Sequence, residues 1–248
     1  MLKEARYSVI LETVNERFFV SFHDLMKLTN SSESTIRADL VELASEGKLI
    51  RLRGGAQAID KDQISYELGN ETKMGIEIDA KKRIAQQASN LIKDRSTVYI
   101  DAGTTTLQLI DFIKAKDISI VTNSLSIAKK AKLKGYKVYV IGGDIKLSTD
   151  AFVGSLAQDI VTRFSFDMGF FGCNGIDFIQ GITTPEVEEA IIKQTAMSKC
   201  KKIYILADHT KFGVKTAVTF HPFVGEEIIT DKILNNNYLN KGIMEVNK

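Results

Sequence analysis

The stretch Val98–Thr106 of this 248-residue chain carries residue types that could bind an anion. Apolar residues end at Asp101, and Gly103 then leads into three consecutive hydroxyl side chains, after which apolar residues take helical spacing. A strand that turns into a helix leaves free backbone N–H groups at the helix start, where the helix dipole favours negative charge. The stretch predicts a phosphate or carboxylate site. The alternative is an ordinary connection in which one Thr caps the helix.

The elements that must position this stretch alternate between strand and helix. Strands are predicted at 97–101, 118–122, 137–141, 167–172, 203–207 and 226–230, with helices near 104–115, 124–134, 155–164 and 184–199. Such alternation predicts an α/β fold with a mostly parallel, Rossmann-like sheet that is covered on both faces. Ligands of such sheets bind beyond the carboxyl ends of the strands.

Small, hydroxyl-bearing or ionisable residues follow five of the predicted strands. They are Asp101, Gly103, Thr104, Thr105 and Thr106, then Thr122, Asn123 and Ser124, then Gly142 and Gly143, then Asn174 and Gly175, and finally Asp208 and Lys211. Because parallel strands end at one edge, we expect these residues to converge on one ligand site. The competing explanation is that turns of all α/β proteins are rich in Gly, Asn and Asp.

A further candidate lies at the start of the predicted helix 184–199. Thr184 is expected to cap this helix, with Pro185 in its first turn. Glu186 and Lys193 would lie along one face and could reach the ligand. The alternative is a surface pair between Glu189 and Lys193, with Glu186 placed favourably for the helix dipole.

The first sixty residues predict three short helices and a hairpin. Ala5–Phe18 carries a helical apolar stripe, Phe19-Val20 is expected to be a break, and Ser21 and Ser32 can cap the second and third helices. Residues 49–56 alternate as a strand and end at a Gly-Gly turn, with Arg51 and Arg53 on one face. This order is typical of a winged helix-turn-helix, which lays its third helix in the DNA major groove.

The net charge of this region does not favour DNA binding. Residues 1–60 hold eight Lys/Arg and nine Asp/Glu, whereas DNA-binding domains usually have a positive excess. A winged-helix module that contacts protein is therefore the alternative. DNA binding is favoured by distribution, because Arg37, Lys48, Arg51 and Arg53 are expected to cluster at the recognition end.

The N-terminal motif closely resembles that of the DeoR family of bacterial transcription regulators. Residues 32–40 read SESTIRADL and residues 51–56 read RLRGGA, against the family patterns S-x-x-T-I-R-R-D-L and R-x-H-G-G-A. Ala38 replaces the usual second Arg, and Arg53 replaces the usual His. The resemblance implies DNA binding with an altered operator preference, and the expected contact residues are Ser32, Ser34, Thr35, Arg37, Arg51 and Arg53.

The rest of the chain resembles the DeoR-family sensor domain, to about residue 235, through segments such as DAGTTT at 101–106, VTNS at 121–124 and DHTKFG at 208–213. The resemblance implies a fold like that of ribose-5-phosphate isomerase and the CoA transferases, and a phosphorylated sugar as effector. Gly103–Thr106 would hold the phosphate with Lys211 as cationic partner. Asp101, Asn123, Glu186 and Asp208 would bond the sugar hydroxyls.

We therefore predict a winged helix-turn-helix domain at 1–58, a linker at 59–78 and an effector-binding domain at 79–248. The expected function is that of a DNA-binding regulator, a repressor of sugar-metabolism genes, whose partners are double-stranded operator DNA, a sugar phosphate and further copies of itself in a dimer or tetramer. The rival hypothesis is a sugar-phosphate isomerase, with Asp101, Glu186 or Asp208 as base.

Composition narrows the class of protein. Apolar content of 44%, charged content of 26% and a net charge of +2 are ordinary for a globular protein. The absence of a long apolar run or signal-peptide pattern predicts a cytoplasmic protein without membrane contact. Cys173, Cys200 and three His form no ligand pattern, so neither a metal nor a cofactor is expected.

Overall fold

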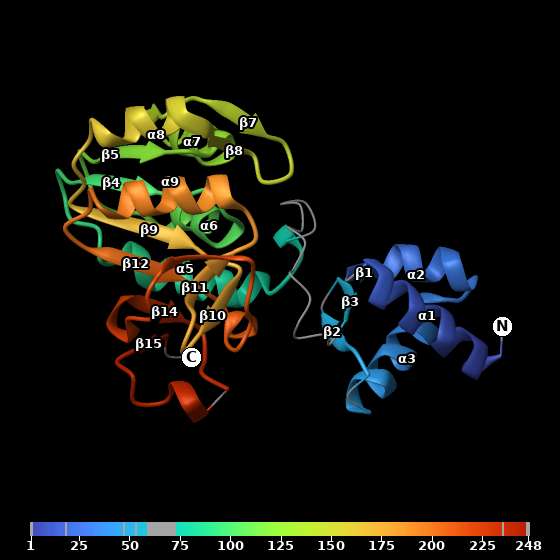
Figure 1. Cartoon of the computed structure of the whole chain (residues 1–248). Helices are drawn as coiled ribbons and strands as arrows, with labels where there is room; N and C mark the ends of the chain where they lie inside the picture. Colours follow the sequence, from blue (N-terminus) through green and yellow to red (C-terminus); the bar gives the residue numbers. More distant parts are fainter. Residues whose placement is uncertain are drawn as a thin grey trace. The chain divides into compact units, whose positions relative to one another are not determined.

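The computed structural model describes residues 2–17, 19–46, 48–52, 54–58, 73–234 and 236–246. The chain divides into two compact units (Figure 1). The N-terminal unit holds residues 1–66 and 75–77, and the C-terminal unit holds residues 67–74 and 78–248. Most of the predicted linker, 59–72, lies outside the described residues. Among the helices that are described, none is long and apolar enough to cross a membrane.

The N-terminal unit combines three helices with a small antiparallel sheet. The helices are α1 (Lys3–Arg17), α2 (Phe22–Thr29) and α3 (Glu33–Ser45), and the sheet has the order β1-β3-β2 with β1 (Phe19–Ser21), β2 (Ile50–Leu52) and β3 (Gly55–Gln57). The oxygen of Ser21 accepts from Asp24 N at 3.1 Å and that of Ser32 from Thr35 N at 3.3 Å, so both predicted caps are confirmed. Figure 1 shows α1–α3 packed around one another.

The expected break at Phe19-Val20 is wrong, because these residues belong to β1. Val20 pairs with Ala56 of β3, and its side chain is buried among Ile10, Val14 and Leu25. The pairing joins residues more than thirty positions apart. Local periodicity cannot reveal such a pairing.

The C-terminal unit is built on a seven-stranded sheet in which every neighbouring pair is parallel. The order is β15-β14-β12-β9-β4-β5-β6. The strands are β4 (Thr97–Ile100), β5 (Ser119–Thr122), β6 (Lys137–Val140), β9 (Met168–Gly172), β12 (Ile203–Leu206), β14 (Ile228–Thr230) and β15 (Met244–Glu245). All six predicted strands are present, and the predicted parallel α/β class is confirmed.

Helices cover both faces of this sheet. One layer holds α5 (Ile78–Ser89), α6 (Thr104–Phe112) and α7 (Leu125–Leu133), and the other holds α8 (Gly154–Thr162) and α9 (Val187–Met197) (Figure 1). Strand β4 alternates between them: Val98 and Ile100 pack in the core with α5–α7, and Tyr99 packs in the core with α8 and α9. Burial on both faces explains why the strands read as continuous apolar runs.

Two small sheets extend the unit beyond the predicted elements. Strands β7 (Asp144–Lys146) and β8 (Ala151–Val153) form a hairpin, and β10 (Gly175–Asp177), β11 (Gly181–Thr184) and β13 (Val218–His221) form a three-stranded sheet. Short 3₁₀ helices lie at His209–Lys211, Gly225–Glu227 and Asn236–Tyr238. The sequence did not predict these strands, although several are as long as strands of the main sheet that it did predict.

The predicted cap of helix 184–199 is wrong. Thr184 ends β11, where it pairs with Val218, and α9 begins only at Val187 with Glu186 as its N-cap residue. Strand pairing thus holds Thr184 in extended backbone and delays the helix by three residues.

Candidate functional site

The carboxyl ends of five adjacent strands form one edge of the parallel sheet. In spatial order these are β12, β9, β4, β5 and β6, which are the five strands whose ends carry the predicted effector residues. Asp208 follows β12, Asp101 follows β4 and Asn123 follows β5. The structure therefore brings the predicted strand ends together. Some of the side chains there form hydrogen bonds within the protein, and others have no protein partner.

The start of α6 presents unpaired donors at this edge. Within the described chain, the backbone N–H groups of residues 103–106 and the hydroxyls of Thr104 and Thr105 donate to no protein acceptor. The loop is held in place from both sides, because Asn123 Oδ1 accepts from Ala102 N at 2.8 Å and Thr106 Oγ1 donates to Asp101 O at 2.7 Å. This arrangement suits an anion, and the Thr106 hydroxyl is used in a hydrogen bond within the loop.

A buried ion pair lies beneath the loop. The Lys193 ammonium donates to Asp101 Oδ2 and, at 3.2 Å, to Gly172 O, and the exposed fractions of Lys193 and Asp101 are 4% and 1%. Burial lowers the pKa of Lys193, but the charges of Asp101 and Glu189 outweigh this and raise it above its usual value. Lys193 was expected to reach the ligand, yet its ammonium is committed to Asp101. The predicted Glu189–Lys193 surface pair is not formed either, since both residues are buried.

One oxygen of each of two carboxylates remains unsatisfied. Asp101 Oδ1 and Asp208 Oδ2 are both buried and accept no hydrogen bond from the described residues. The other Asp208 oxygen accepts from Thr210 N at 3.0 Å and from the Thr210 hydroxyl. Burial opposes ionisation of Asp208, but the Lys211 charge and the Thr210 hydrogen bonds hold its pKa below the usual value. Buried unpaired acceptors are costly, so they indicate an absent donor such as a ligand hydroxyl.

Lys211 and Cys173 lie near these carboxylates. The Lys211 ammonium makes no ion pair with any residue that the structure describes, and it is close enough to Asp208 to lower the pKa of that carboxyl. Cys173 follows β9, where the charges of four neighbours influence the pKa of its thiol: Lys211, Lys193, Asp208 and Asp101. Burial raises the pKa of its thiol to about 12, so it stays protonated and does not act as a nucleophile at neutral pH.

Several predicted effector residues have contacts within the protein that account for their type. Thr122 Oγ1 accepts from Ser124 N at 3.0 Å, and Ser124 Oγ caps α7 by accepting from Ile127 N at 3.2 Å. The Asn174 N–H donates to Thr183 O at 3.0 Å. At two of the glycines a side chain has no room, because a Cβ at Gly143 would lie 2.5 Å from Val153 O and one at Gly175 would lie 2.3 Å from Val214 O. Gly142 has room for a Cβ, but its φ of 66° favours glycine.

The Glu186 carboxylate pairs with a lysine of another element. Its Oε1 lies 2.9 Å from Lys146 Nζ, and Lys146 also lies 3.4 Å from Glu189 Oε1. Lys146 belongs to the β7–β8 hairpin, which the sequence did not predict. The hairpin is thereby tied to the start of α9.

Asp231 is a polar residue at the same edge that the sequence reasoning missed. It follows β14 and accepts from His209 N at 2.8 Å and from His209 Nδ1 at 3.0 Å, with Arg83 of α5 at 3.6 Å. The signal was present, because Asp231 directly follows the sixth predicted strand. No group of three potential metal ligands occurs among the described residues.

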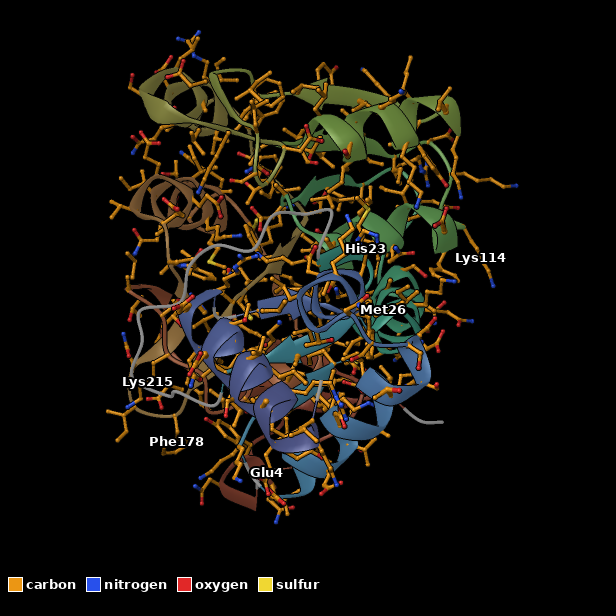
Figure 2. The ribbon with its side chains drawn as sticks, turned by 90° about the vertical axis from the view of Figure 1, so that its right-hand side faces the viewer. Glu4, His23, Met26, Lys114, Phe178 and Lys215 are labelled. Carbon is orange, nitrogen blue, oxygen red and sulfur yellow. The ribbon has the colours of Figure 1, made fainter. Side chains whose placement is uncertain are left out.

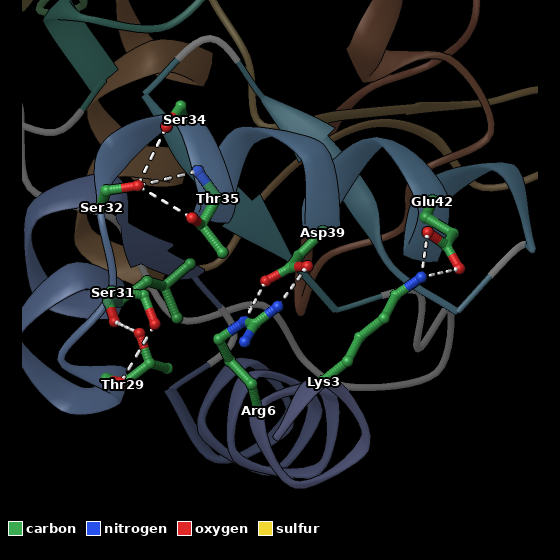
Figure 3. A network of polar contacts seen from close by, with 10 residues as sticks. Lys3, Arg6, Thr29, Ser31, Ser32, Ser34, Thr35, Asp39 and Glu42 are labelled. Atoms are coloured by element: carbon green, nitrogen blue, oxygen red, sulfur yellow. Dashed lines mark hydrogen bonds and ion pairs between the residues drawn. The ribbon is translucent and has the colours of Figure 1, made fainter. Parts of the chain in front are cut away.

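The N-terminal unit presents its own candidate surface at the start of α3. Ser32 Oγ lies 2.9 Å from Ser34 Oγ and 2.8 Å from Thr35 Oγ1, so three predicted DNA-contacting hydroxyls form one cluster (Figure 3). Arg37, one turn on, lies 4.6 Å from the Phe22 ring centre and donates to Glu33 at 2.6 Å. Its guanidinium is therefore oriented before any DNA arrives.

The structure separates Lys48 from Arg37, two members of the expected basic cluster. Arg51 is exposed on β2, whereas Lys48 follows the far end of α3 from Arg37 and pairs with Glu46 at 2.8 Å. Arg53 lies outside the described residues. The cause is the length of α3, which separates Arg37 from Lys48.

Two ion pairs join α1 to α3 behind this surface (Figure 3). Arg6 makes two hydrogen bonds to Asp39, at 2.5 and 3.0 Å, and Lys3 Nζ contacts Glu42 at 2.8 Å. Asp39 and Glu42 thus neutralise cations on α1. The simple charge count of residues 1–60 therefore describes the recognition end poorly.

Comparison with known proteins matches both units. Residues 6–62 match the DeoR-like helix-turn-helix domain, and residues 76–232 match the DeoR C terminal sensor domain. The chain is 35% identical to the uncharacterized HTH-type transcriptional regulator FruR of Bacillus subtilis, over 100% of both chains. It is 31% identical to the lactose phosphotransferase system repressor of Staphylococcus aureus, over 89% of this chain and 88% of the relative.

Among solved structures, a ribose 5-phosphate isomerase from Plasmodium falciparum superposes with a TM-score of 0.40 and 16% identity. The superposition covers 53% of this chain and 52% of the isomerase, so the chain spans about half of that protein.

Proposed function

Since the chain belongs to the DeoR family of transcription regulators, we propose that it is a sequence-specific repressor of sugar-metabolism genes that a phosphorylated sugar controls. The α3 surface of Ser32, Ser34, Thr35 and Arg37 would read the operator, with Arg51 and Arg53 on the DNA backbone. A relative named as a repressor of a lactose phosphotransferase system supports the link to sugars.

One observation carries the assignment of the effector. At one edge of the sheet, unpaired N–H donors and Lys211 lie near two buried carboxylate oxygens that have no donor of their own. The donors suit a phosphate, and the carboxylates suit hydroxyl groups. A ligand that satisfies both carries an anion at one end and several hydroxyls along its length, as a sugar phosphate does.

The hydrogen bonds of the three candidate bases bear on the isomerase alternative. A general base needs a free carboxylate near the substrate carbon, whereas one oxygen of Asp101 already accepts from Lys193 and from Gly172 N at 3.2 Å. Glu186 is likewise engaged by Lys146. Asp101 Oδ1 and Asp208 Oδ2 each accept no hydrogen bond from the described residues, so these two carboxylates are the places where the isomerase alternative would have its base.

A thermal-shift screen tests the proposal. Pentose and hexose monophosphates are compared with the matching free sugars and with inorganic phosphate. We expect at least one sugar phosphate to raise the unfolding temperature by several degrees at millimolar concentration, and the free sugars to have no effect, because stabilisation grows as ln(1 + [L]/Kd). If no sugar phosphate stabilises the protein, the effector assignment fails.

The same ligands decide between regulator and enzyme. NMR of the bound sugar phosphate in D₂O would detect exchange of the proton at C2. Binding without exchange supports a regulator, and sustained turnover would support the isomerase instead.

A further inference from the structure

The β7–β8 hairpin, residues 144–153, is attached to the C-terminal unit on two sides, and on one of them the attachment is made by the backbone. Phe152 N donates to Asn123 O at 2.7 Å. Leu125 N donates to Asp150 O at 3.2 Å. These hydrogen bonds join the hairpin to the end of β5 and the start of α7, and we call this the hinge side.

The other side of the hairpin meets the start of α9 through side chains. Lys146 Nζ lies 2.9 Å from Glu186 Oε1 and 3.4 Å from Glu189 Oε1. The Thr149 hydroxyl donates to Glu189 Oε1 at 2.8 Å. We call these contacts the latch. Because side-chain pairs can separate while the backbone pairing of the hairpin stays intact, this is the side on which the hairpin can come free.

The hairpin connects the two supports of the anion loop, residues 102–106. On the hinge side, the Asn123 side chain accepts from the first N–H of this loop at 2.8 Å. On the latch side, Glu189 lies one helical turn before Lys193, which donates to Asp101. Strand β4 lies between β5 and β9 and leads into the loop, so a segment that joins the end of β5 to the start of α9 passes the end of β4. Figure 1 shows the hairpin at the end of the sheet to which the arrows of β5 and β9 point.

The two strands of the hairpin differ in burial. Ala151 and Val153 of β8 are buried, whereas Ile145 of β7 is 47% exposed and Leu147 in the turn is 90% exposed. A two-stranded hairpin is marginally stable by itself. Little apolar surface therefore holds β7 and the turn in place, and the latch supplies most of what keeps them against α9.

We propose that the β7–β8 hairpin is a strap that closes the effector site, and that it opens by moving about its hinge side when the latch of Lys146 with Glu186 and Glu189 separates. Entry and exit of a ligand then require the latch to open. The role of the strap in effector binding rests on the proposed function. The strap itself does not depend on which ligand the site takes.

Glu189 links the latch to the ion pair beneath the anion loop. It is 7% exposed, and although burial lowers the pKa of Lys193, the charges of Asp101 and Glu189 raise it above its usual value. When Lys146 moves away, Glu189 loses a cation and competes more strongly with Asp101 for Lys193, because a buried carboxylate without a cation is costly. A closed strap thus favours the Lys193–Asp101 pair that supports the loop.

Access to Cys173 tests the strap in the full chain without any ligand. Cys173 follows β9 at the site, whereas Cys200 bridges to Phe166 ahead of β9, at the opposite end of that strand. Burial raises the pKa of both thiols to about 12, so the two are matched in thiolate content. In Lys146→Met, iodoacetamide should modify Cys173 at least three times faster than in wild type, and Cys200 at an unchanged rate, as measured by peptide mass spectrometry.

Two further lysine variants serve as controls. Lys146→Arg keeps the positive charge of the latch, so Cys173 should react nearly as slowly as in wild type. Lys215→Met removes a lysine from a different ion pair, because Lys215, labelled in Figure 2, lies 3.7 Å from Asp177 and has a side chain that is 54% exposed. This variant should leave the rate of Cys173 unchanged.

A second variant weakens the same latch from α9. The Glu186 side chain is 43% exposed, so Glu186→Gln removes one carboxylate of the latch at little cost to folding. Cys173 should again react faster than in wild type, by a smaller factor than in Lys146→Met. This variant decides the question if Lys146→Met does not fold.

Hydrogen exchange followed by mass spectrometry distinguishes the two sides of the hairpin. In Lys146→Met the amides of residues 144–149 should exchange at least tenfold faster, and those of residues 124–128 at the start of α7 should not change. An unchanged Cys173 rate in the folded latch variants would overturn the strap, and so would faster reaction of both thiols or faster exchange on both sides. A failed sugar-phosphate screen would refute the effector but leave these results standing, so the two proposals fail separately.

Discussion

At the scale of single residues, the proposed effector site lies at the carboxyl ends of the strands. Its character depends on which polar atoms already bond to protein groups and which have no protein partner. Lys193 and Thr106 donate hydrogen bonds to protein acceptors within the proposed site. Several polar groups have no partner among the described residues: the Lys211 ammonium, the N–H groups of 103–106, and one oxygen each of Asp101 and Asp208. A residue type predicts capacity for a hydrogen bond, but only the fold decides whether a neighbour has already used it.

Replacing Lys211 should change both acid stability and ligand binding. Because the pKa of Asp208 is lowered in the folded state, its ionisation stabilises the protein above about pH 4, and this contribution is lost as the pH falls through the folded pKa. Lys211→Met removes the largest favourable charge, so the midpoint of acid unfolding, followed by circular dichroism, should move to higher pH. The thermal shift caused by sugar phosphate should also shrink. Lys215→Met, on a neighbouring loop, should do neither; equal behaviour of the two variants would contradict the assignment.

At the scale of elements, α1 and α3 are joined by one protected and one exposed ion pair. The Arg6–Asp39 pair has exposed side-chain fractions of 12% and 5%, against 55% and 45% for Lys3–Glu42. Removing one partner of a protected pair leaves the other desolvated and unpaired, whereas an exposed pair is replaced by water. The two pairs therefore differ in what they contribute to the position of α3.

This difference can be measured with isosteric variants of the full chain. Asp39→Asn should cost about 2 kcal/mol and speed hydrogen exchange across α1 and α3. Glu42→Gln should leave exchange nearly unchanged. The interpretation fails if Glu42→Gln is the more damaging of the two, when exchange is followed by mass spectrometry.

Two arginines on different elements of the N-terminal unit should affect DNA differently. Arg37→Ala should reduce the preference for operator over random DNA, because Arg37 lies with the hydroxyl cluster on α3. Arg51→Ala, on β2, should weaken binding to all sequences and lower the salt slope by about one. Fluorescence anisotropy at several salt concentrations separates these effects. Full selectivity in Arg37→Ala would place the recognition surface elsewhere.

At the scale of the whole molecule, hydrophobic periodicity and the residue types that follow the strands account for most of what the sequence predicted correctly. The helix caps at Ser21 and Ser32 follow local rules, and so do the six predicted strands of the parallel sheet, so the sequence alone predicts them. β1 and the end of β11 at Thr184 depend on pairing with distant segments, and the β7–β8 hairpin is held at the start of α9 by Lys146. The contact between Glu186 and Lys146 was missed for that reason, since no local pattern places a hairpin beside α9.

Control of DNA binding by a sugar phosphate requires that occupancy of the strand-end site change the affinity of the N-terminal unit for operator DNA. Coupling of this kind typically amounts to 1–3 kcal/mol, which is roughly a 5- to 150-fold change in affinity. Thr105 offers a way to break it, because it is 9% exposed at the start of α6 and a bulky side chain there would occupy the anion position.

The most direct test is operator affinity with and without a stabilising sugar phosphate, measured by fluorescence anisotropy on an operator isolated from random DNA by selection. The sugar phosphate should change the Kd of wild type at least fivefold. Thr105→Trp should bind the operator as tightly as wild type but show no response to the ligand. An unchanged wild-type Kd at a ligand concentration that saturates the thermal shift would contradict the account.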